Sequence, residues 1–559
     1  MRYRPEVALH QARRRHPLGA VLDAHPPSPD ELCLAIAIIR SRPPFSRGPQ
    51  ELRRMERQLP WQRHYYNTHE YVELFGSSPD EIARVEEFAR SYGLDVVESD
   101  PGRRCIMLSG PLRTYARAFD VEFVRYTHPS GTYRSYHRAV RVPRTLARVI
   151  EAVLGFDDRP GFKHHAMSVH LAGERPVEAE EVARAYRFPS STGHGQTIGI
   201  IELAGGFHLE DIRAFAAKHN IAAPRVSVVE LDGQKNDPAR PSLVRRFWTA
   251  FEAAARSGTA PPGSLTGSAD SDNQVEWTIE TTMDIELTMA FAPCARIVVY
   301  LAPNTPHGKY HALSTALTDH INSPSIISCS WGSPEEDVTI PGVFAIERLL
   351  QSAALRGVTV CFSSGDDGDG SASDGKRRVN FPASSPYALA CGGTHLAIRP
   401  RGRIHETVWN ETMAGKNMAS TGGSSRLFRA PRWQRDAHIT RISGHGGRGI
   451  PDVAAKADLA GGYGTIVGGI EIPMGGTSAA APLWAGLTAR INEILGVPVG
   501  LLSPLLYTPA LRGVTHFVTR GDNGPNFHAA PGWNACTGWG SPKGAKLLRA
   551  LRGKSSRSR

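Results

Sequence analysis

Residues 475–482 read Gly-Gly-Thr-Ser-Ala-Ala-Ala-Pro and run directly into an apolar stretch that ends near Leu495. Two glycines allow a sharp turn of the backbone, and a proline is tolerated in the first turn of a helix. Ser478 is therefore expected where a helix begins, near unpaired N–H groups and the positive end of the helix dipole. This placement suits a nucleophile whose attack creates an oxyanion. A glycine-rich turn with a Ser/Thr cap would have the same sequence, so the octet alone does not decide between the two.

A serine nucleophile needs a base, and histidine is the first candidate. Subtilisins share the Gly-Thr-Ser motif and pair it with a His-Gly-Thr-His segment, but none of the 22 histidines of this chain stands in such a segment. The strand expected at 197–203 ends Ile-Ile-Glu202-Leu, where a subtilisin has an aspartate. A histidine triad is therefore disfavoured.

Carboxylates are the second candidate. Glu280 and Asp284 are four residues apart, so both lie on one face of a helix. Met283, Leu287 and Ala290 mark an apolar face close by, which lets the pair point inward. Two like charges on a half-buried face raise one pKa and share a proton. The alternative is an ordinary solvated acidic face.

A third group of polar residues, 363–370, reads Ser-Ser-Gly-Asp-Asp-Gly-Asp-Gly and follows an apolar run at 358–363. Functional loops gather at the carboxyl ends of strands in parallel sheets. The segment is not an EF-hand loop, because Ala372 replaces the glycine and Arg378 the final glutamate. An Asp/Gly turn without function is the alternative reading.

The elements that must position these residues fall into two parts, since 559 residues exceed what one core usually supports. Residues 1–30 form a basic N-terminal tail. Residues 31–156 mix short strands and helices, which indicates a small α+β domain, and 157–177 lack periodicity and indicate a linker. Strands are expected at 31–39, 104–109 and 120–126, and helices at 80–92 and 145–153.

Residues 178–553 have a different pattern. Short, nearly continuous apolar runs alternate with helical periodicity, as in an α/β domain whose parallel sheet is covered by helices on both faces. The expected strands are 197–203, 296–301, 325–330 and 358–363, and the expected helices are 275–291, 343–356 and 478–495. Residues 257–273 are rich in Gly, Ser, Pro and Ala and are expected to form a surface loop.

Composition excludes several classes of function. No run of 18 apolar residues is present, so no membrane span is expected. The net charge of +11 is scattered, without a basic stripe interleaved with aromatics, which disfavours nucleic-acid binding. Seven cysteines without a CxxC pair indicate neither a zinc site nor a disulfide framework. The first residues show no secretion signal, and a monomer is expected.

Together these motifs resemble the sedolisins, the family of serine-carboxyl peptidases, over almost the whole chain. The segment from Tyr66 to Pro160 resembles the inhibitory prodomain of that family. The other matching segments are Glu280 to Glu286, Ala292-Pro293, Tyr300 to Asn304, Ser330 to Gly332, Ser364 to Asp366, Phe381 to Ala383, Cys391 to Thr394, Glu406 to Asn410, Ser420 to Ser424 and Gly475 to Pro482.

The resemblance implies a subtilisin-like catalytic domain, 178–553, preceded by a ferredoxin-like prodomain, 31–156, that inhibits it intramolecularly until the activation linker, 157–177, is cut. It implies that Ser478 is the nucleophile, Glu280 the general base, Asp284 the residue that orients Glu280, and Asp366 a protonated donor in the oxyanion hole. It also implies peptide or protein substrates, an acidic pH optimum and an extracellular location. The substrate-binding residues would be Ser330, Trp331, Gly332, Gly422 and Gly423.

Family members bind one calcium ion near the C-terminus, through an Asp-Ile pair and a Gly-x-Gly-x-Asp segment. Here the corresponding residues are His516, Phe517, Gly532 and Asn534, so both carboxylates are replaced. A hard cation prefers charged oxygen ligands. Asn534 and backbone carbonyls can coordinate only weakly, and the sequence therefore argues against the one cofactor, Ca²⁺, that the resemblance implies.

Three functions are compatible with this sequence. The first is an acid endopeptidase made as a self-processing zymogen. The second is a tripeptidyl-peptidase with the same chemistry. The third is a degenerate, non-enzymatic binding module, against which the presence of Ser478, Glu280, Asp284 and Asp366 argues.

Overall fold

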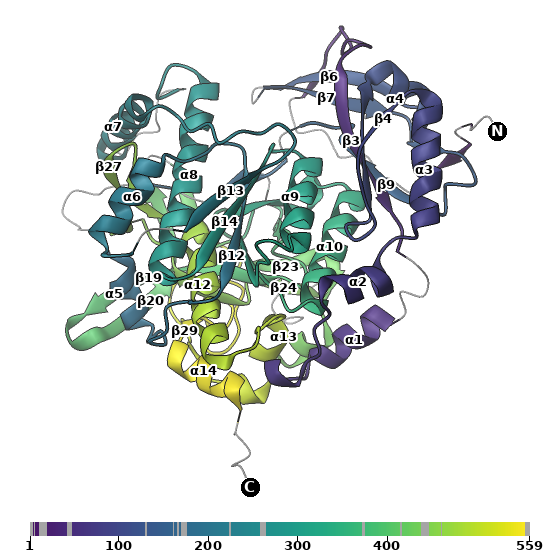
Figure 1. Ribbon diagram of the computed structural model, residues 1–559. Helices are drawn as coiled ribbons and strands as arrows, with labels where there is room; N and C mark the ends of the chain where they lie inside the picture. The colour runs from purple at the N-terminus through teal and green to yellow at the C-terminus, as the bar shows by residue number, and fades with distance from the viewer. Residues whose placement is uncertain are drawn as a thin grey trace.

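Two lobes pack against each other in the computed structural model (Figure 1). The N-terminal lobe lies against helices of the larger C-terminal one. The structure describes residues 4, 6–9, 20–41, 47–128, 131–159, 161–164, 167–168, 176–222, 225–257, 264–371, 375–413, 416–437, 446–459 and 461–553.

The larger lobe is built on a twisted sheet whose seven parallel strands confirm the predicted α/β class. Its strand order is β13-β14-β12-β15-β17-β19, with β25 parallel to β19 and β20 antiparallel to it. The strands are β12 (Thr197–Leu203), β13 (Val226–Glu230), β14 (Arg296–Ala302), β15 (Ile326–Cys329), β17 (Thr359–Ser363), β19 (Leu389–Arg399), β20 (Arg403–Val408) and β25 (Val453–Lys456).

Helices cover both faces of this sheet, as predicted. The helices α5 (Ala179–Ala185), α6 (Leu209–Lys218), α8 (Ala269–Phe291) and α12 (Thr477–Leu495) share one core with it, and α9 (Pro306–Thr318) and α10 (Ile340–Leu355) share the other. Burial on both sides explains why the strands are apolar runs rather than alternating sequences. Within the described residues, none of the helices combines the length and the apolarity needed to cross a bilayer.

The predicted surface loop at 257–273 is only partly a loop. Helix α8 begins at Ala269, six residues before the predicted 275, and Ser268 caps it by accepting from the Ser271 N–H. Residues 258–263 lie outside the described part of the chain. The preceding helix, α7 (Pro241–Ser257), buries Phe247, Trp248 and Phe251 in the core. The cap and the buried aromatics, rather than the small-residue composition, decide the structure here.

The smaller lobe is the predicted α+β domain. Its antiparallel sheet has the order β4-β5-β3-β9. Helix α3 precedes the second of these strands in sequence and α4 follows the third, which is the ferredoxin-like arrangement. The elements are β3 (Leu32–Ile39), α3 (Pro79–Tyr92), β4 (Asp95–Asp100), β5 (Cys105–Pro111), α4 (Leu112–Phe119) and β9 (Ile150–Leu154).

The helix predicted at 145–153 is wrong. Its C-terminal half is strand β9, which pairs antiparallel with β3 from Ile150 to Leu154. The β-branched residues of this segment favour a strand, and β3 would otherwise have an unpaired edge. Tertiary pairing therefore overrides the helical spacing of the apolar residues.

Short strands complete this lobe. The hairpin β6 (Glu122–His128) and β7 (Gly131–His137) is joined by β2 (Val21–Leu22), and β1 (Val7–Ala8) pairs with β8 (Arg141–Val142). Two strands from residues 1–30 thus pair with the α+β domain. The helices α1 (Arg47–Met55) and α2 (Thr68–Phe75) run along the larger lobe (Figure 1) and pack against Leu355 and Leu501.

Strand β3 has both of its faces buried, each by a different lobe. Ala35, Ala37 and Ile39 pack with α3 and α4 in the core of the small domain. Ile36 and Ile38 belong instead to the core that contains α9 and α10 of the large domain. Because side chains alternate along a strand, one uninterrupted apolar run serves both the folding and the docking of the small domain.

The segment between the two lobes runs along the edge of the large one. Strand β10 (Lys163–His164) pairs antiparallel with β16 (Trp331–Pro334), Lys163 opposite Gly332 and His164 opposite Trp331. Strand β11 (Met167–Ser168) pairs with β27 (Ile470–Gly475), Met167 opposite Gly475. The predicted linker therefore pairs as an extra strand at two places near Ser478, with β16 and with β27.

Candidate active site

Ser478 lies in the first turn of α12, as predicted from the octet. Gly476 has φ +92° and donates its N–H to the Ala457 carbonyl at 2.7 Å. A Cβ at Gly475 would lie 2.5 Å from that same carbonyl oxygen, so the turn requires its glycines. The Ser478 side chain is fully buried, and its Oγ has no hydrogen-bond partner among the described residues.

The prediction that Pro482 lies in the first turn of the helix is wrong. Pro482 lies beyond the first turn of α12, where a residue normally donates its N–H to the carbonyl four residues earlier. Since proline has no N–H, the Ser478 carbonyl loses this partner. The Ser330 hydroxyl lies 3.4 Å from that carbonyl oxygen and also donates to Asp284 Oδ2 at 2.7 Å. Ser330 thus connects the Ser478 backbone to Asp284.

Glu280 and Asp284 are both fully buried on α8, so the solvated acidic face is ruled out. Helix α8 packs closely on α12: a Cβ at Gly486 would lie 2.5 Å from Phe291 Cβ. The burial of Asp284 raises its pKa well above the ordinary value, and the charges of Glu202 and Glu280 raise it further. The two carboxyl groups therefore interact electrostatically inside the protein, where the charge of Glu280 disfavours ionisation of Asp284.

Glu202 joins this group, and the sequence did not identify it as a site residue. It lies on β12, accepts from the Trp331 indole N–H at 2.9 Å, and is fully buried. Burial and then the charge of Glu280 raise its pKa to about 8. A hydrogen bond between the Glu202 and Asp284 carboxyls contributes to both pKa values, and such a bond needs a proton on one of them. The signal was present in the sequence: a glutamate ends the strand where a subtilisin has its triad aspartate.

Asp366 lies after β17 and contacts Thr477, the residue that precedes Ser478. Its Oδ1 accepts from both the N–H and the hydroxyl of Thr477, at 2.9 and 2.7 Å. Its Oδ2 is buried and has no hydrogen-bond partner among the described residues. Burial raises the pKa of Asp366 to about 8, although the bonds from Thr477 oppose this, and the Glu280 charge adds to it. Asp366 is therefore a neutral acid at low pH, with its proton on Oδ2.

The predicted substrate-binding residues occupy two places. Trp331 and Gly332 form the edge of β16 on which the linker pairs, and Ser330 precedes them. Gly422 and Gly423 lie beside the loop of Asp366, where the Gly422 N–H donates to the Gly368 carbonyl at 3.1 Å. A Cβ at Gly422 would lie 1.6 Å from the Ala535 carbonyl oxygen, so close backbone packing accounts for this glycine.

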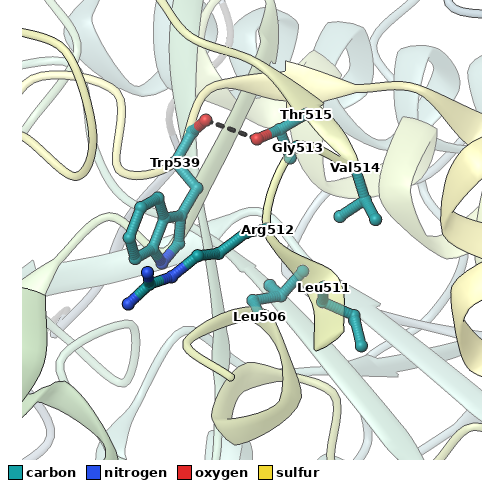
Figure 2. A pocket seen from close by; sticks show the side chains of 7 residues that line it. All are labelled: Leu506, Leu511, Arg512, Gly513, Val514, Thr515 and Trp539. Atoms are coloured by element: carbon teal, nitrogen blue, oxygen red, sulfur yellow. Dashed lines mark hydrogen bonds between the residues drawn. The ribbon is translucent and has the colours of Figure 1, made fainter. Parts of the chain in front are cut away.

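The residues at the family's calcium position do not fit a cation. The Asn534 amide nitrogen donates to the carbonyls of Val518 and Ala530 at 3.3 and 3.2 Å, which places N–H hydrogens where a cation would need oxygens. Burial lowers the pKa of His516 to about 4, and three cationic side chains lower it further: Lys543, Arg187 and Lys546. A small pocket next to His516 contains none of the predicted catalytic residues; its lining includes Thr515 and Trp539, whose carbonyl accepts from the Thr515 hydroxyl at 2.6 Å (Figure 2).

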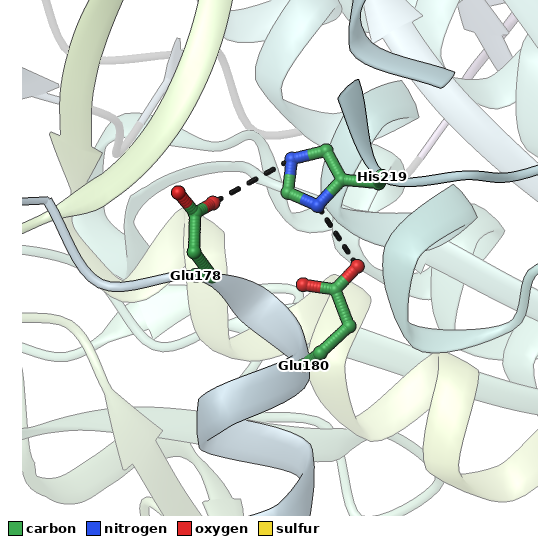
Figure 3. Close-up of side chains that lie close together, drawn as sticks. All are labelled: Glu178, Glu180 and His219. Atoms are coloured by element: carbon green, nitrogen blue, oxygen red, sulfur yellow. Dashed lines mark hydrogen bonds and ion pairs between the residues drawn. The ribbon is translucent and has the colours of Figure 1, made fainter. Parts of the chain in front are cut away.

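Two other clusters have the ligand types of a divalent metal site. In one, Glu178, Glu180 and His219 converge at the start of α5 (Figure 3). His219 lies 2.8 Å from Glu180 and 3.6 Å from Glu178, and Lys218 is an ion-pair partner of Glu178 at 3.1 Å. The second cluster is His395, Glu411 and Asp458, in which Lys456 contacts Asp458 at 2.7 Å. In both clusters a lysine already partly neutralises the carboxylates.

Comparison with known proteins finds relatives over most of the chain. Residues 20–159 match the model of the pro-kumamolisin activation domain, and residues 263–498 match that of the subtilase family. Kumamolisin of Bacillus sp. (strain MN-32) is 38% identical over 98% of this chain and 96% of its own length. Sedolisin of Pseudomonas sp. (strain 101) is 27% identical over 86% of this chain and 81% of its own.

A solved structure shows the same fold. Pseudomonas sedolisin, a serine-carboxyl proteinase complexed with two molecules of pseudo-iodotyrostatin, superposes with a TM-score of 0.55 at 25% identity, over 68% of this chain and all of that one. The buried carboxyl group, the serine at the start of α12 and the extent of the similarity to kumamolisin lead to one conclusion. This chain belongs to the sedolisin family and is a serine-carboxyl peptidase with an activation prodomain.

Proposed function

We propose that this peptidase is an acid-acting endopeptidase made as a self-processing zymogen, and that it works through Ser478, Glu280, Asp284 and Asp366. The state of Asp366 is the observation that carries the proposal. Because Oδ1 accepts both bonds from Thr477, the proton of the neutral acid on Oδ2 is free to be donated. A donor placed beside a nucleophile stabilises the negative charge that develops on the substrate's carbonyl oxygen.

The reaction proceeds by two acyl transfers. Ser478 Oγ attacks the carbonyl carbon of the substrate while its proton passes to the Glu280 carboxylate. The carbonyl oxygen becomes an oxyanion and accepts the hydrogen bond from Asp366. The C–N bond then breaks as Glu280 returns the proton to the leaving amine, which leaves an acyl-enzyme on Ser478. Water repeats the sequence and releases the acid. Asp284 orients Glu280, and Glu202 and Ser330 hold Asp284.

The two carboxyl groups set the pH range of this mechanism. Glu280 must be ionised to accept the proton of Ser478. Asp366 must keep its proton, which it loses as the pH rises toward its raised pKa of about 8. Activity is therefore expected in acid and is lost toward alkaline pH.

The path of the linker favours internal cleavage over release of tripeptides. The chain pairs with β16 through Lys163 and His164, and again with β27 through Met167 and Ser168. A polypeptide thus extends in both directions from the region of Ser478. The alternative has its own support, because tripeptidyl-peptidase 1 of Canis lupus familiaris is 32% identical over 49% of this chain, which is about half of that protein.

The interface between prodomain and catalytic domain carries a charged cluster that links inhibition to pH. His311 of α9 contacts Asp232 at 2.8 Å and the prodomain's Glu98 at 3.7 Å. Arg103 of the prodomain lies 3.2 Å from His311 and is paired with Glu98 and Asp100. The prodomain also buries the Ile36 and Ile38 face of β3 here.

The directions of two pKa shifts indicate which of these groups weakens the interface when its protonation changes in acid. The hydrogen bond from His311 lowers the pKa of Glu98, and burial opposes this effect. The ionised Glu98 therefore stabilises the docked prodomain at any pH above the ordinary pKa of a glutamate, and this stabilisation is lost as the pH falls through the lowered pKa. Burial lowers the pKa of His311, but the hydrogen bonds with Asp232 and Glu98 outweigh it and raise the pKa overall. The stabilisation that the charged His311 gives to the interface is therefore fully present below the ordinary pKa of a histidine, and acid does not remove it. Acid therefore weakens the interface through Glu98, and not through the histidine.

The residues at the position of the family's calcium ion do not suit a cation. The Asn534 amide and the neutral His516, surrounded by lysine and arginine, replace the two carboxylates. We therefore include independence from calcium in the proposal.

Self-processing tests the whole assignment. At pH 4 the 60.8 kDa chain is expected to convert to a smaller form and then to cleave unstructured peptides, including peptides with a blocked amino terminus. Ser478→Ala is expected to remain full length. Gel electrophoresis and peptide mass spectrometry measure both. Full activity at pH 8 with none at pH 4 would contradict the mechanism, cleavage restricted to free amino termini would indicate the tripeptidyl alternative, and no cleavage at all would indicate a binding module.

The proton on Asp366 has its own test. Asp366→Ala removes one oxyanion donor and is expected to lower kcat by about 10²–10³-fold. Asp366→Asn keeps a donor that does not titrate, so its activity is expected to be higher than that of the alanine variant and to persist on the alkaline side, where the native enzyme loses activity. The pH profiles of kcat for the three proteins make the comparison. An alkaline limb at the same pH in native and Asp366→Asn enzymes would show that another group sets it.

The prodomain cluster is tested by the pH of activation. Glu98→Gln mimics protonation of Glu98, so half-maximal conversion is expected at a higher pH than in the native zymogen. Glu87→Gln, an exposed site on the prodomain helix α3, is the matched control and is expected to leave the midpoint unchanged. Conversion is followed by electrophoresis over a pH series at fixed time. An unchanged midpoint for Glu98→Gln would remove this cluster from the activation mechanism.

Independence from calcium is measured by thermal melting of the Ser478→Ala zymogen. Neither EDTA nor added Ca²⁺ is expected to shift Tm. The double variant His516→Asp and Asn534→Asp restores both carboxylates, and its Tm is expected to rise with Ca²⁺ because binding to the folded state alone stabilises it. A fall in the Tm of the parent zymogen in EDTA that Ca²⁺ but not Zn²⁺ reverses would contradict the proposal.

A further inference from the structure

Lys309 is a buried lysine whose charge has an unusual environment. Its side chain is 1% exposed in the core between α9 and the sheet. Its Nζ donates to the Trp331 carbonyl at 2.6 Å and lies 3.8 Å from the centroid of the Phe162 ring. Burial lowers its pKa to about 8, and among the described residues no carboxylate counteracts this. An aromatic face and one carbonyl therefore hold the ammonium group.

Phe162 belongs to the activation linker, and its backbone is held independently of its ring. The Phe162 N–H donates to Asn304 Oδ1 at 3.1 Å, and Asn304 Nδ2 donates to the Phe162 carbonyl at 2.9 Å. The Ser333 hydroxyl donates to the carbonyl of Gly161. The next two residues pair with β16. Since these bonds involve only the backbone of the linker, any extended peptide could make them.

We propose that Lys309 and Asn304 form a subsite of the substrate cleft that selects an aromatic side chain, at the position that Phe162 occupies in the zymogen. The inference rests on the proposed function, in which peptide substrates replace the linker along β16. Asn304 holds the backbone of the substrate residue, and Lys309 discriminates between side chains.

The chemistry of the site favours an aromatic ring over an acidic side chain. A desolvated ammonium group attracts the negative face of a ring, and Lys309 keeps its charge throughout the acidic range, below its lowered pKa of about 8. A substrate Asp or Glu has an ordinary pKa near 4 and loses part of its charge in the acidic range where this enzyme is proposed to work. Phe162 itself is 5% exposed and shares its core with Trp331 and Phe362, so the surroundings suit an apolar body.

The register identifies which substrate residue occupies the subsite. A substrate strand that pairs as Lys163 does with Gly332, and as His164 does with Trp331, continues with its next residue opposite Ser330, which neighbours Ser478. If that residue provides the carbonyl that Ser478 attacks, the residue at the Phe162 position is the fourth before the scissile bond.

Substrates that differ only at this position test the subsite in the processed native enzyme. A set of quenched fluorescent peptides carries Phe, cyclohexylalanine, Leu or Glu there. Cyclohexylalanine has nearly the shape of Phe without its π-system, so kcat/KM for Phe is expected to be about 5- to 30-fold higher, the factor that a cation–π contact supplies. In Lys309→Met the ratio is expected to fall to about 1, whatever the absolute rates. Equal rates for Phe and cyclohexylalanine in the native enzyme, or a preference for Glu, would overturn the proposal.

A second measurement does not depend on catalysis. In the full-length Ser478→Ala zymogen, the rate at which trypsin cuts after Lys163 reports release of the linker. Phe162→Leu is expected to raise this rate by about 5- to 30-fold when Lys309 is present, and to have little effect in the Lys309→Met background. Equal effects in both backgrounds would overturn the contact between the ring and the ammonium group. The effect of Phe162→Leu could depend on Lys309 while the enzyme cleaves no peptide. In that case the proposed function fails, and the contact between Phe162 and Lys309 stands.

Discussion

The burial of several carboxyl groups around one serine is the constraint on which the rest of this structure depends. Glu280, Asp284, Glu202 and Asp366 all lie inside the protein, and the charge of Glu280 raises the pKa of each of the other three. Water does not screen these charges, so the group cannot ionise completely at ordinary pH. Some of these carboxyl groups therefore keep their protons at a pH where an exposed carboxyl has lost its own, which is the state that the proposed mechanism requires of Asp366.

The fold supplies the groups that hold this arrangement. Pro482 leaves the Ser478 carbonyl without its helical partner, and Ser330 lies between that carbonyl and Asp284. Trp331 donates its indole N–H to Glu202, while its backbone is the edge on which the linker pairs. Its own carbonyl accepts from Lys309. One short strand therefore connects the acidic group, the substrate edge and the subsite proposed for aromatic side chains.

In the prodomain, too, a single strand has more than one role. Strand β3 is apolar throughout because one set of its side chains forms the prodomain core and the other packs on α9 and α10. Periodicity alone could not show this, since a strand buried by its own domain on both faces has the same sequence pattern. The charged contacts of His311 with Asp232 and with the prodomain's Glu98 belong to the same interface.

The sequence by itself determined the α/β class. It also indicated two domains and pointed to Ser478, Glu280, Asp284 and Asp366 as candidate site residues, because glycine turns, apolar runs and four-residue spacings are local features. It predicted a helix at 145–153 where β9 forms, since only the partner strand β3 decides that pairing. The sequence did not identify Glu202 as a site residue, because Glu202 contacts Asp284 only when β12 and α8 pack together. Burial and residues distant in the chain likewise decide three other features. These are the protonation of the buried carboxyl groups, the cationic surroundings of His516 and the contact of Lys309 with Phe162. Only the tertiary structure decides them, because desolvation is a property of the packed protein and not of a segment.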